Sequence, residues 1–292
     1  MRNNFMRYIL SLTVIAAVGA LLFWSDLFVS QEELEESKET EEIIFQTKNN
    51  GIETEDIRME ETEQKITEAM AMGQEKQRIL NLSAGDLAAE GMIQPEILSS
   101  LFTSYEIDEG IFGRINGKSF TENEHISLTE LSYLRMLYYG FDGNTYVGEM
   151  IVNQKIADDV LRIFQSLYEN QYPIEKMVLI DEYGADDESS MNENNTSAFN
   201  YRTISGSSKL SNHSYGTAID LNPKYNPYVK NASDGSVVCQ PESGREYADR
   251  TKEFSYKIDT NDLAYKLFTQ AGFTWGGNWN SVKDYQHFEK EY

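Results

Sequence analysis

The chain has 292 residues, of which 25 are Lys or Arg and 48 are Asp or Glu, so its formal net charge is −23. This excess of acid disfavours a nucleic-acid-binding protein, because affinity for phosphate backbones comes mainly from clustered Lys and Arg. The length allows one or two domains, and 40% hydrophobic residues are enough for a sizeable core. The single cysteine, Cys239, excludes an internal disulfide and a zinc or iron–sulfur site made only of cysteines from one chain.

The N-terminal segment predicts a membrane anchor. Residues 8–25 carry no formal charge and, as a helix rising about 1.5 Å per residue, would span roughly 27 Å, close to one bilayer core. A cleaved signal peptide is the alternative, but the small residues that suit cleavage lie in the middle of the apolar run. Arg2 and Arg7 precede the run, so the positive-inside rule predicts residues 1–7 in the cytoplasm and the rest outside. We expect a single-pass membrane protein with an extracytoplasmic domain, or a secreted one if the segment is cleaved.

Residues 26–84 predict an acidic linker. Between Gln31 and Lys76 there are 15 acidic and 5 basic residues, and the only aromatic residue is Phe45. Such a composition buries too little apolar surface to offset chain entropy, so it indicates a solvated tether or a marginal helix. A short amphipathic helix near Ile66 is compatible with the spacing of apolar residues.

A folded domain is expected over residues 85–292, where aromatic residues and periodic apolar segments become frequent. Apolar residues at helical spacing predict helices over 128–141, 156–171 and 262–273. A short aliphatic run predicts a strand over 176–183. Helices and short strands in irregular order indicate an α+β fold.

One segment combines a histidine, a glycine and an aspartate at close spacing. His213 precedes Gly216 by three residues and Asp220 by seven. If residues 217–221 form a strand, its alternation turns Asp220 away from the larger apolar side chains. Gly216 would let the chain turn between His213 and that strand, so that an imidazole and a carboxylate converge on one point.

A second pair of polar residues, Asp284 and His287, lies near the C-terminus at a spacing of three. Two histidines and one carboxylate, with a further carboxylate nearby, are the ligand set of a catalytic zinc site whose fourth position is held by water. The remaining histidine, His125, lies in a polar stretch and is expected at the surface. Cys239 has no basic neighbour and is expected to be an inert thiol.

The whole string resembles the zinc D-Ala-D-Ala carboxypeptidase family of VanY type, whose relatives include phage L-alanyl-D-glutamate endopeptidases. The family shows Ser-x-His-x-x-Gly-x-Ala-x-Asp, followed later by Asp or Glu-x-x-His. The matching residues are Ser211, His213, Gly216, Ala218, Asp220, Asp284 and His287. The resemblance covers roughly residues 110–292. It implies a single compact zinc DD-peptidase-like domain, with a small, mainly antiparallel sheet and flanking helices.

The resemblance also implies roles for single residues. His213, Asp220 and His287 would bind one zinc ion per chain, and Asp284 would be the catalytic base. Family members use an arginine upstream of the first histidine to stabilise the oxyanion, and Arg202 is the best match. An ordinary salt bridge is the alternative for Arg202, because its separation from His213 is shorter than in some relatives.

These observations predict a membrane-anchored zinc peptidase that cleaves peptidoglycan stem peptides as a D,D-carboxypeptidase, with no nucleic-acid partner. Endopeptidase action between L-Ala and D-Glu is the nearest alternative, since the sequence does not reveal the specificity pocket. A non-catalytic cell-wall-binding module and a regulatory protein working through its acidic tether are two further alternatives. The aromatic residues Trp275, Trp279 and Phe288 flank the second motif and are expected to support it as core.

Overall fold

The computed structural model describes residues 52–232 and 235–291. The chain divides into two compact units, Met1–Ala69 and Met70–Tyr292. The predicted anchor lies outside the described residues. Within the described ranges, no helix is both long enough and apolar enough to cross a membrane.

The second half of the acidic linker is helical rather than a flexible tether. Helix α3 (Ile52–Leu80) is longer than the short helix that the sequence indicates. Its last turn belongs to the core of the second unit, where Ile79 is only 1% exposed. The Arg135 guanidinium donates to the carbonyls of Ile79, at 2.6 Å, and of Leu82, at 2.9 Å, which satisfies the end of the helix. The domain start at residue 85 stays a prediction, but a core residue already precedes it.

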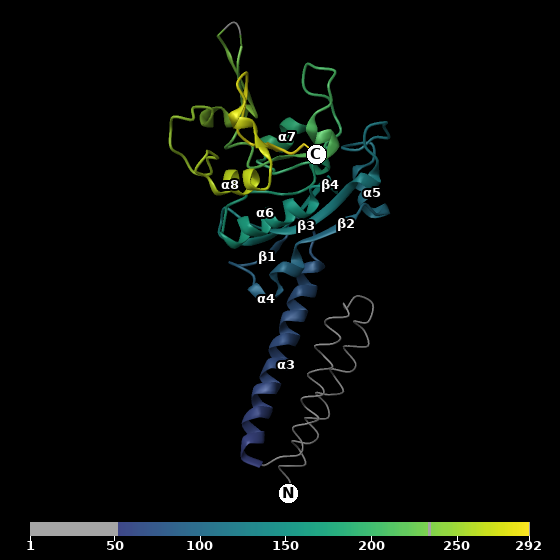
Figure 1. Cartoon of the computed structure of the whole chain (residues 1–292), viewed down its shortest axis with the longest axis vertical. Coiled ribbons are helices and arrows are strands. Elements are labelled where there is room, and N and C mark those ends of the chain that lie inside the picture. Colours follow the sequence, from purple (N-terminus) through teal and green to yellow (C-terminus); the bar gives the residue numbers. More distant parts are fainter. Residues whose placement is uncertain (1–51, 233–234, 292) are drawn as a thin grey trace. The chain divides into compact units, whose positions relative to one another are not determined.

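The largest sheet has four antiparallel strands in the order β1-β4-β3-β2. Its strands are β1 (Leu87–Ala89), β2 (Thr103–Glu106), β3 (Leu131–Tyr139) and β4 (Thr145–Asn153). A tight turn joins β3 to β4, with Gly143 at φ 83° and the Gly140 amide donating to the Asn144 carbonyl. Strand β4 is buried along nearly its whole length. Figure 1 shows helix α6 lying across this sheet.

The helix predicted over 128–141 is wrong. The segment forms a single 3-10 turn, Leu128–Glu130, and then strand β3. Leu134, Met136 and Leu137 are all buried, so both faces of the strand are covered and its apolar residues do not alternate. A strand buried on both faces gives a pattern that periodicity alone does not distinguish from a helix.

The strand predicted over 176–183 is also wrong. Only a bridge between Lys176 and Asn195 forms, and Ile180–Tyr183 is a 3-10 helix. Side chains take the place of a partner strand, because the Asn195 amide bonds both the N–H and the carbonyl of Val178. The backbone is therefore satisfied without a ladder.

The other two predicted helices are confirmed as α6 (Ala157–Glu169) and α8 (Leu263–Gln270). The two helices pack against each other, with the rings of Phe164 and Phe268 edge to face at 6.2 Å between centroids. Both rings are fully buried in the main core. Strong period-3.6 patterns made these helices predictable.

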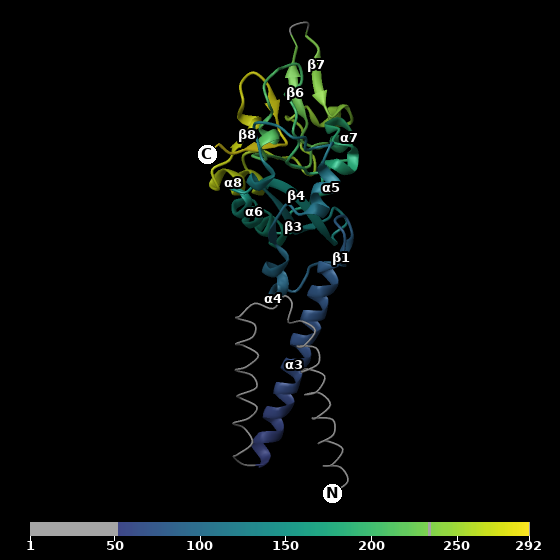
Figure 2. The same ribbon diagram turned by 90° about the vertical axis from the view of Figure 1, so that its right-hand side faces the viewer.

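Two small antiparallel sheets carry the C-terminal part of the domain, in the orders β5-β10-β8 and β7-β6-β9. Their strands are β5 (Ala218–Asp220), β6 (Tyr228–Asn231), β7 (Val237–Gln240), β8 (Thr274–Trp275), β9 (Lys283–Asp284) and β10 (His287–Glu289). Figure 2 shows β6 and β7 as a hairpin that extends away from β3 and β4. The α+β class with small antiparallel sheets is therefore confirmed.

Short helices complete the described chain. They are α4 (Pro95–Leu98), α5 (Glu109–Ile115) and α7 (Asp187–Asn192), with 3-10 helices Ser99–Leu101, Asn212–Tyr215, Glu242–Tyr247 and Gly276–Asn278. Of these 3-10 helices, Asn212–Tyr215 contains His213, and Gly276–Asn278 precedes Asp284 and His287 in the chain.

Candidate metal centre

His213 is held by a short and well-capped 3-10 helix. The Ser211 hydroxyl accepts from the His213 amide at 3.3 Å, and Gly216 ends the helix at φ 67°. On the imidazole, Nδ1 lies 2.5 Å from the backbone carbonyl of Ala198. The backbone amide and the ring Nδ1 of His213 are thus both held by hydrogen bonds, and Nε2 remains for other partners.

The register of β5 against β10 brings the two motifs together. Asp220 lies directly opposite His287, and Ile219 opposite Phe288. The ring of Phe288 stacks on Phe268 of α8 at 4.3 Å between centroids, so this face of the pair belongs to the core. Because side chains alternate along a strand, Asp220 and His287 share the opposite face.

The three predicted ligands converge. His213 Nε2 lies 3.2 Å from His287 Nδ1 and 3.2 Å from Asp220 Oδ2, and His287 Nδ1 lies 3.0 Å from Asp220 Oδ1. One ligand atom from each residue falls within 4.8 Å of the others. We call these three residues the His213–Asp220–His287 cluster.

Hydrogen bonds on the far sides of the rings assign the tautomers. A carbonyl only accepts, so Ala198 requires a proton on Nδ1 of His213 and leaves a lone pair on Nε2 of the neutral ring. The Glu289 carboxylate, 3.0 Å from His287 Nε2, leaves a lone pair on Nδ1 in the same way. Acceptor atoms therefore face one another in the cluster, which requires positive charge from a proton or a metal ion. Two imidazole nitrogens and one carboxylate fit a zinc ion.

The pKa values reflect this demand for positive charge. Burial would raise the pKa of Asp220, but the two imidazoles hold it well below its usual range. Burial would lower the pKa of His287, but its hydrogen bonds with Asp220 and Glu289 raise it to about 10. The hydrogen bond with His287 also lowers the pKa of Glu289. These three side chains could hold a metal ion in place of the extra proton.

Asp284 lies beside the cluster without belonging to it. It is on β9, paired with Tyr228 of β6, and its Oδ1 accepts from the Gln286 amide at 3.2 Å. Burial, with the charge of Asp220, raises the pKa of Asp284 to about 6. The Asp284 side chain lies so close to residue 276 that only glycine fits there, because a Cβ on Gly276 would lie 2.8 Å from the Asp284 Cβ. A carboxyl group with a pKa near neutrality suits proton transfer.

The structure describes no interaction between the Arg202 side chain and the cluster. Its guanidinium forms an ion pair with Asp187, as in the salt-bridge alternative. Its backbone is tied to the site instead, since its amide donates to the Ser214 hydroxyl and its carbonyl accepts from the Ser211 amide. A role of Arg202 in oxyanion stabilisation stays a prediction.

The aromatic residues around the second motif divide into two groups. Trp275 and Phe288 are buried core residues, as expected. Trp279 is only partly buried, and its ring lies beside His287 at 5.2 Å between centroids. His125 is exposed and bonds the Tyr201 hydroxyl, and Cys239 is buried with a raised thiol pKa, so both expectations hold.

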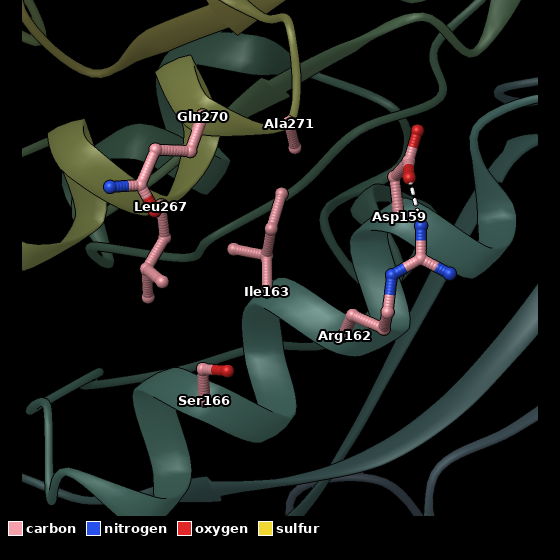
Figure 3. Close-up of a pocket in the computed structure, with 7 residues that line it drawn as sticks. All are labelled: Asp159, Arg162, Ile163, Ser166, Leu267, Gln270 and Ala271. Atoms are coloured by element: carbon pink, nitrogen blue, oxygen red, sulfur yellow. Dashed lines mark hydrogen bonds and ion pairs between the residues drawn. The ribbon is translucent and has the colours of Figure 1, made fainter.

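A surface pocket lies elsewhere, between α6 and α8. Figure 3 shows its lining residues, which are Asp159, Arg162, Ile163, Ser166, Leu267, Gln270 and Ala271. An ion pair between Asp159 and Arg162 lies at its edge. None of the predicted site residues lines this pocket.

Comparison with known protein families gives a match. Residues 205–290 match the family model described as D-alanyl-D-alanine carboxypeptidase. The VanY-type resemblance is confirmed over these residues, a shorter stretch than the expected 110–292. No curated protein and no solved structure matches the chain. The matched segment of this peptidase family contains the cluster and Asp284, whereas Arg202 and the four-stranded sheet precede it.

Gly216 offers a test of how tightly this family motif is packed. A Cβ on Gly216 would lie 2.6 Å from the Asn153 amide nitrogen and 3.0 Å from the Val152 carbonyl carbon, and both are backbone atoms. We expect Gly216→Ala to lower the free energy of unfolding by more than about 2 kcal/mol, since a left-handed φ and a backbone clash add. Thermal or denaturant unfolding measures the loss.

Gly184→Ala is the matched control for that change. Gly184 has the same φ of 67°, and a Cβ there meets no atom within 4 Å. Its alanine variant should lose only the conformational cost, about 1 kcal/mol. Equal losses in the two variants would show that the close approach of Gly216 to β4 does not matter for stability.

Proposed function

We propose that the chain is a zinc-dependent peptidase that acts on peptidoglycan stem peptides and releases their terminal D-Ala. The observation that carries the proposal is the convergence of His213 Nε2, His287 Nδ1 and an Asp220 oxygen inside a segment that matches a D-alanyl-D-alanine carboxypeptidase family. The match supports a peptidase in general, and the donor set supports zinc.

The residues have distinct parts in the proposed reaction. His213, Asp220 and His287 would hold the zinc ion, which would supply Lewis-acid chemistry when bound. Asp284 takes the proton of the attacking water and passes it to the leaving nitrogen. Burial raises the pKa of Asp284, which favours its holding the proton between these two steps. The ring of Trp279, which lies beside His287, would contact a bound peptide.

We also propose that the N-terminal segment anchors this domain on the outer side of the membrane. The support comes from the sequence, in which residues 8–25 are uncharged, Arg2 and Arg7 precede them and acidic residues follow. Such a location would place the site where peptidoglycan is found. Fractionation of cells, with and without protease added from outside, tests this placement, and a protease-resistant chain in the cytosolic fraction would contradict it.

Digestion of defined muropeptides tests the proposed specificity. The full-length chain should release a single D-Ala from pentapeptide stems, as weighed by mass spectrometry. Products cut between L-Ala and D-Glu would instead show the endopeptidase alternative. Stoichiometric zinc without any hydrolysis would support a non-catalytic wall-binding module.

A further inference from the structure

Glu289 belongs to neither sequence motif, but its carboxylate contacts His287 directly. Its Oε2 lies 3.0 Å from His287 Nε2, the ring nitrogen that faces away from Asp220. Glu289 and His287 are two residues apart on β10 and therefore project from the same face of the strand. The side chain of Glu289 is mostly buried, at 19% exposure.

The same Glu289 oxygen has a second partner. The Asn212 amide nitrogen donates to Oε2 at 2.5 Å. Asn212 immediately precedes His213, so this hydrogen bond joins the segments that carry the two histidines. Because an ionised carboxylate only accepts hydrogen bonds, Asn212 must turn its NH₂ group, not its oxygen, toward Glu289.

We propose that Glu289 and Asn212 act as a pair of positioning residues that hold His287 with its proton on Nε2 and its Nδ1 lone pair toward the metal. This inference rests on the proposed zinc site. His213 has its ring fixed by a backbone carbonyl, whereas His287 depends on a side chain that must itself be oriented. Asn212 supplies that orientation by occupying Glu289 with a donor.

Replacing the carboxylate by an amide separates this proposal from a purely structural role. In Glu289→Gln, Asn212 still donates to the amide oxygen and keeps that oxygen toward His287. In the double variant Glu289→Gln with Asn212→Leu, nothing orients the amide, and its NH₂ group can turn toward His287. That NH₂ requires a lone pair on Nε2, which moves the ring proton to Nδ1, the atom that should face the metal.

Zinc affinity of the full-length chain, measured by competition with a chromogenic chelator, tests the pair. Each single variant, Glu289→Gln or Asn212→Leu, should weaken zinc binding by less than about threefold, because in each an oxygen of the side chain at position 289 still accepts from His287 Nε2. The double variant and Glu289→Ala should weaken it by about 10–100-fold, the range for lost support of a metal-binding histidine. The double effect would then exceed the product of the single effects.

Glu291→Gln is the matched control, because it removes the same charge from an exposed residue two positions further on. It should leave zinc affinity unchanged. Additive effects in the cycle, or wild-type affinity in Glu289→Ala, would overturn the proposed pair while leaving the zinc site intact. A wild-type chain without zinc affinity would overturn the zinc site itself.

A spectroscopic measurement reports the tautomer independently of affinity and of activity. The chain has only three histidines, so ¹⁵N-histidine labelling gives three ring systems. In the zinc-loaded wild type we expect the proton of His287 on Nε2 and that of His213 on Nδ1. In the zinc-loaded double variant the His287 signal should weaken or split. Both rings protonated on Nδ1 in the wild type would overturn the proposal.

Discussion

Asp284→Asn should keep its zinc and lose at least about 10²–10⁴-fold in turnover, the usual contribution of general acid–base catalysis. An amide of the same shape preserves the hydrogen bond from Gln286 but cannot accept the proton of the attacking water. Substrate affinity should change little, because the lost interaction is made in the transition state. Asp284 lies outside the three-residue cluster, so the metal ligands remain.

Zinc content and turnover measured together on the same sample check this expectation. Asp108→Asn is a suitable control, because it removes one negative charge at an exposed helix cap that asparagine also satisfies. It should retain both zinc and turnover. Loss of zinc from Asp284→Asn, or turnover near the wild-type value, would show that Asp284 is not the base.

His213→Ala and His287→Ala should each abolish both zinc retention and turnover. Each variant removes one of three protein ligands, and the metal is then too weakly held. His125→Ala provides a control with the same chemistry at an exposed position, and it should keep full zinc content. Asp220→Asn should also weaken zinc binding before it affects any other step.

Metal analysis after dialysis at neutral pH distinguishes these outcomes. The wild type and His125→Ala should hold one zinc per chain, and the two ligand variants should hold none. Circular dichroism of each variant checks that the fold is retained. Stoichiometric zinc in either ligand variant would refute the assignment of that histidine.

More of the candidate site than of the fold could be predicted, because several of its residues lie close together in the sequence. The spacing of Ser211, His213, Gly216 and Asp220 corresponds to a cap, a proposed ligand, a left-handed turn and a second proposed ligand. Each of these functions needs a particular residue type within one short segment. What the sequence could not show is that β5 pairs with β10 in the register that sets Asp220 opposite His287.

The fold was harder to predict wherever tertiary contacts override local pattern. Helices α6 and α8 have one apolar face each and were predictable. Strand β3 is buried on both faces, so its apolar pattern resembles that of a helix, and Val178 bonds the Asn195 side chain instead of a partner strand. Strand order depends on pairings between distant residues, which periodicity does not encode.

The hydrogen-bond partners of His287 and His213 differ in how far the sequence predicts them. Glu289 could have been found, because it follows His287 by two residues and an extended chain places both on one face. The carbonyl of Ala198 could not, since any residue carries such a group. It reaches His213 because Ser197 pairs with Asp220 in an isolated bridge.

Crystallographic anomalous scattering at the zinc edge tests the central claim most directly. For the full-length chain grown with zinc, we predict one strong peak bounded by His213 Nε2, His287 Nδ1 and an Asp220 oxygen, at about 2.0–2.2 Å from each. Asp284 should lie near the peak without binding it. A peak held by other residues, or none at this cluster in crystals containing zinc, would contradict the account.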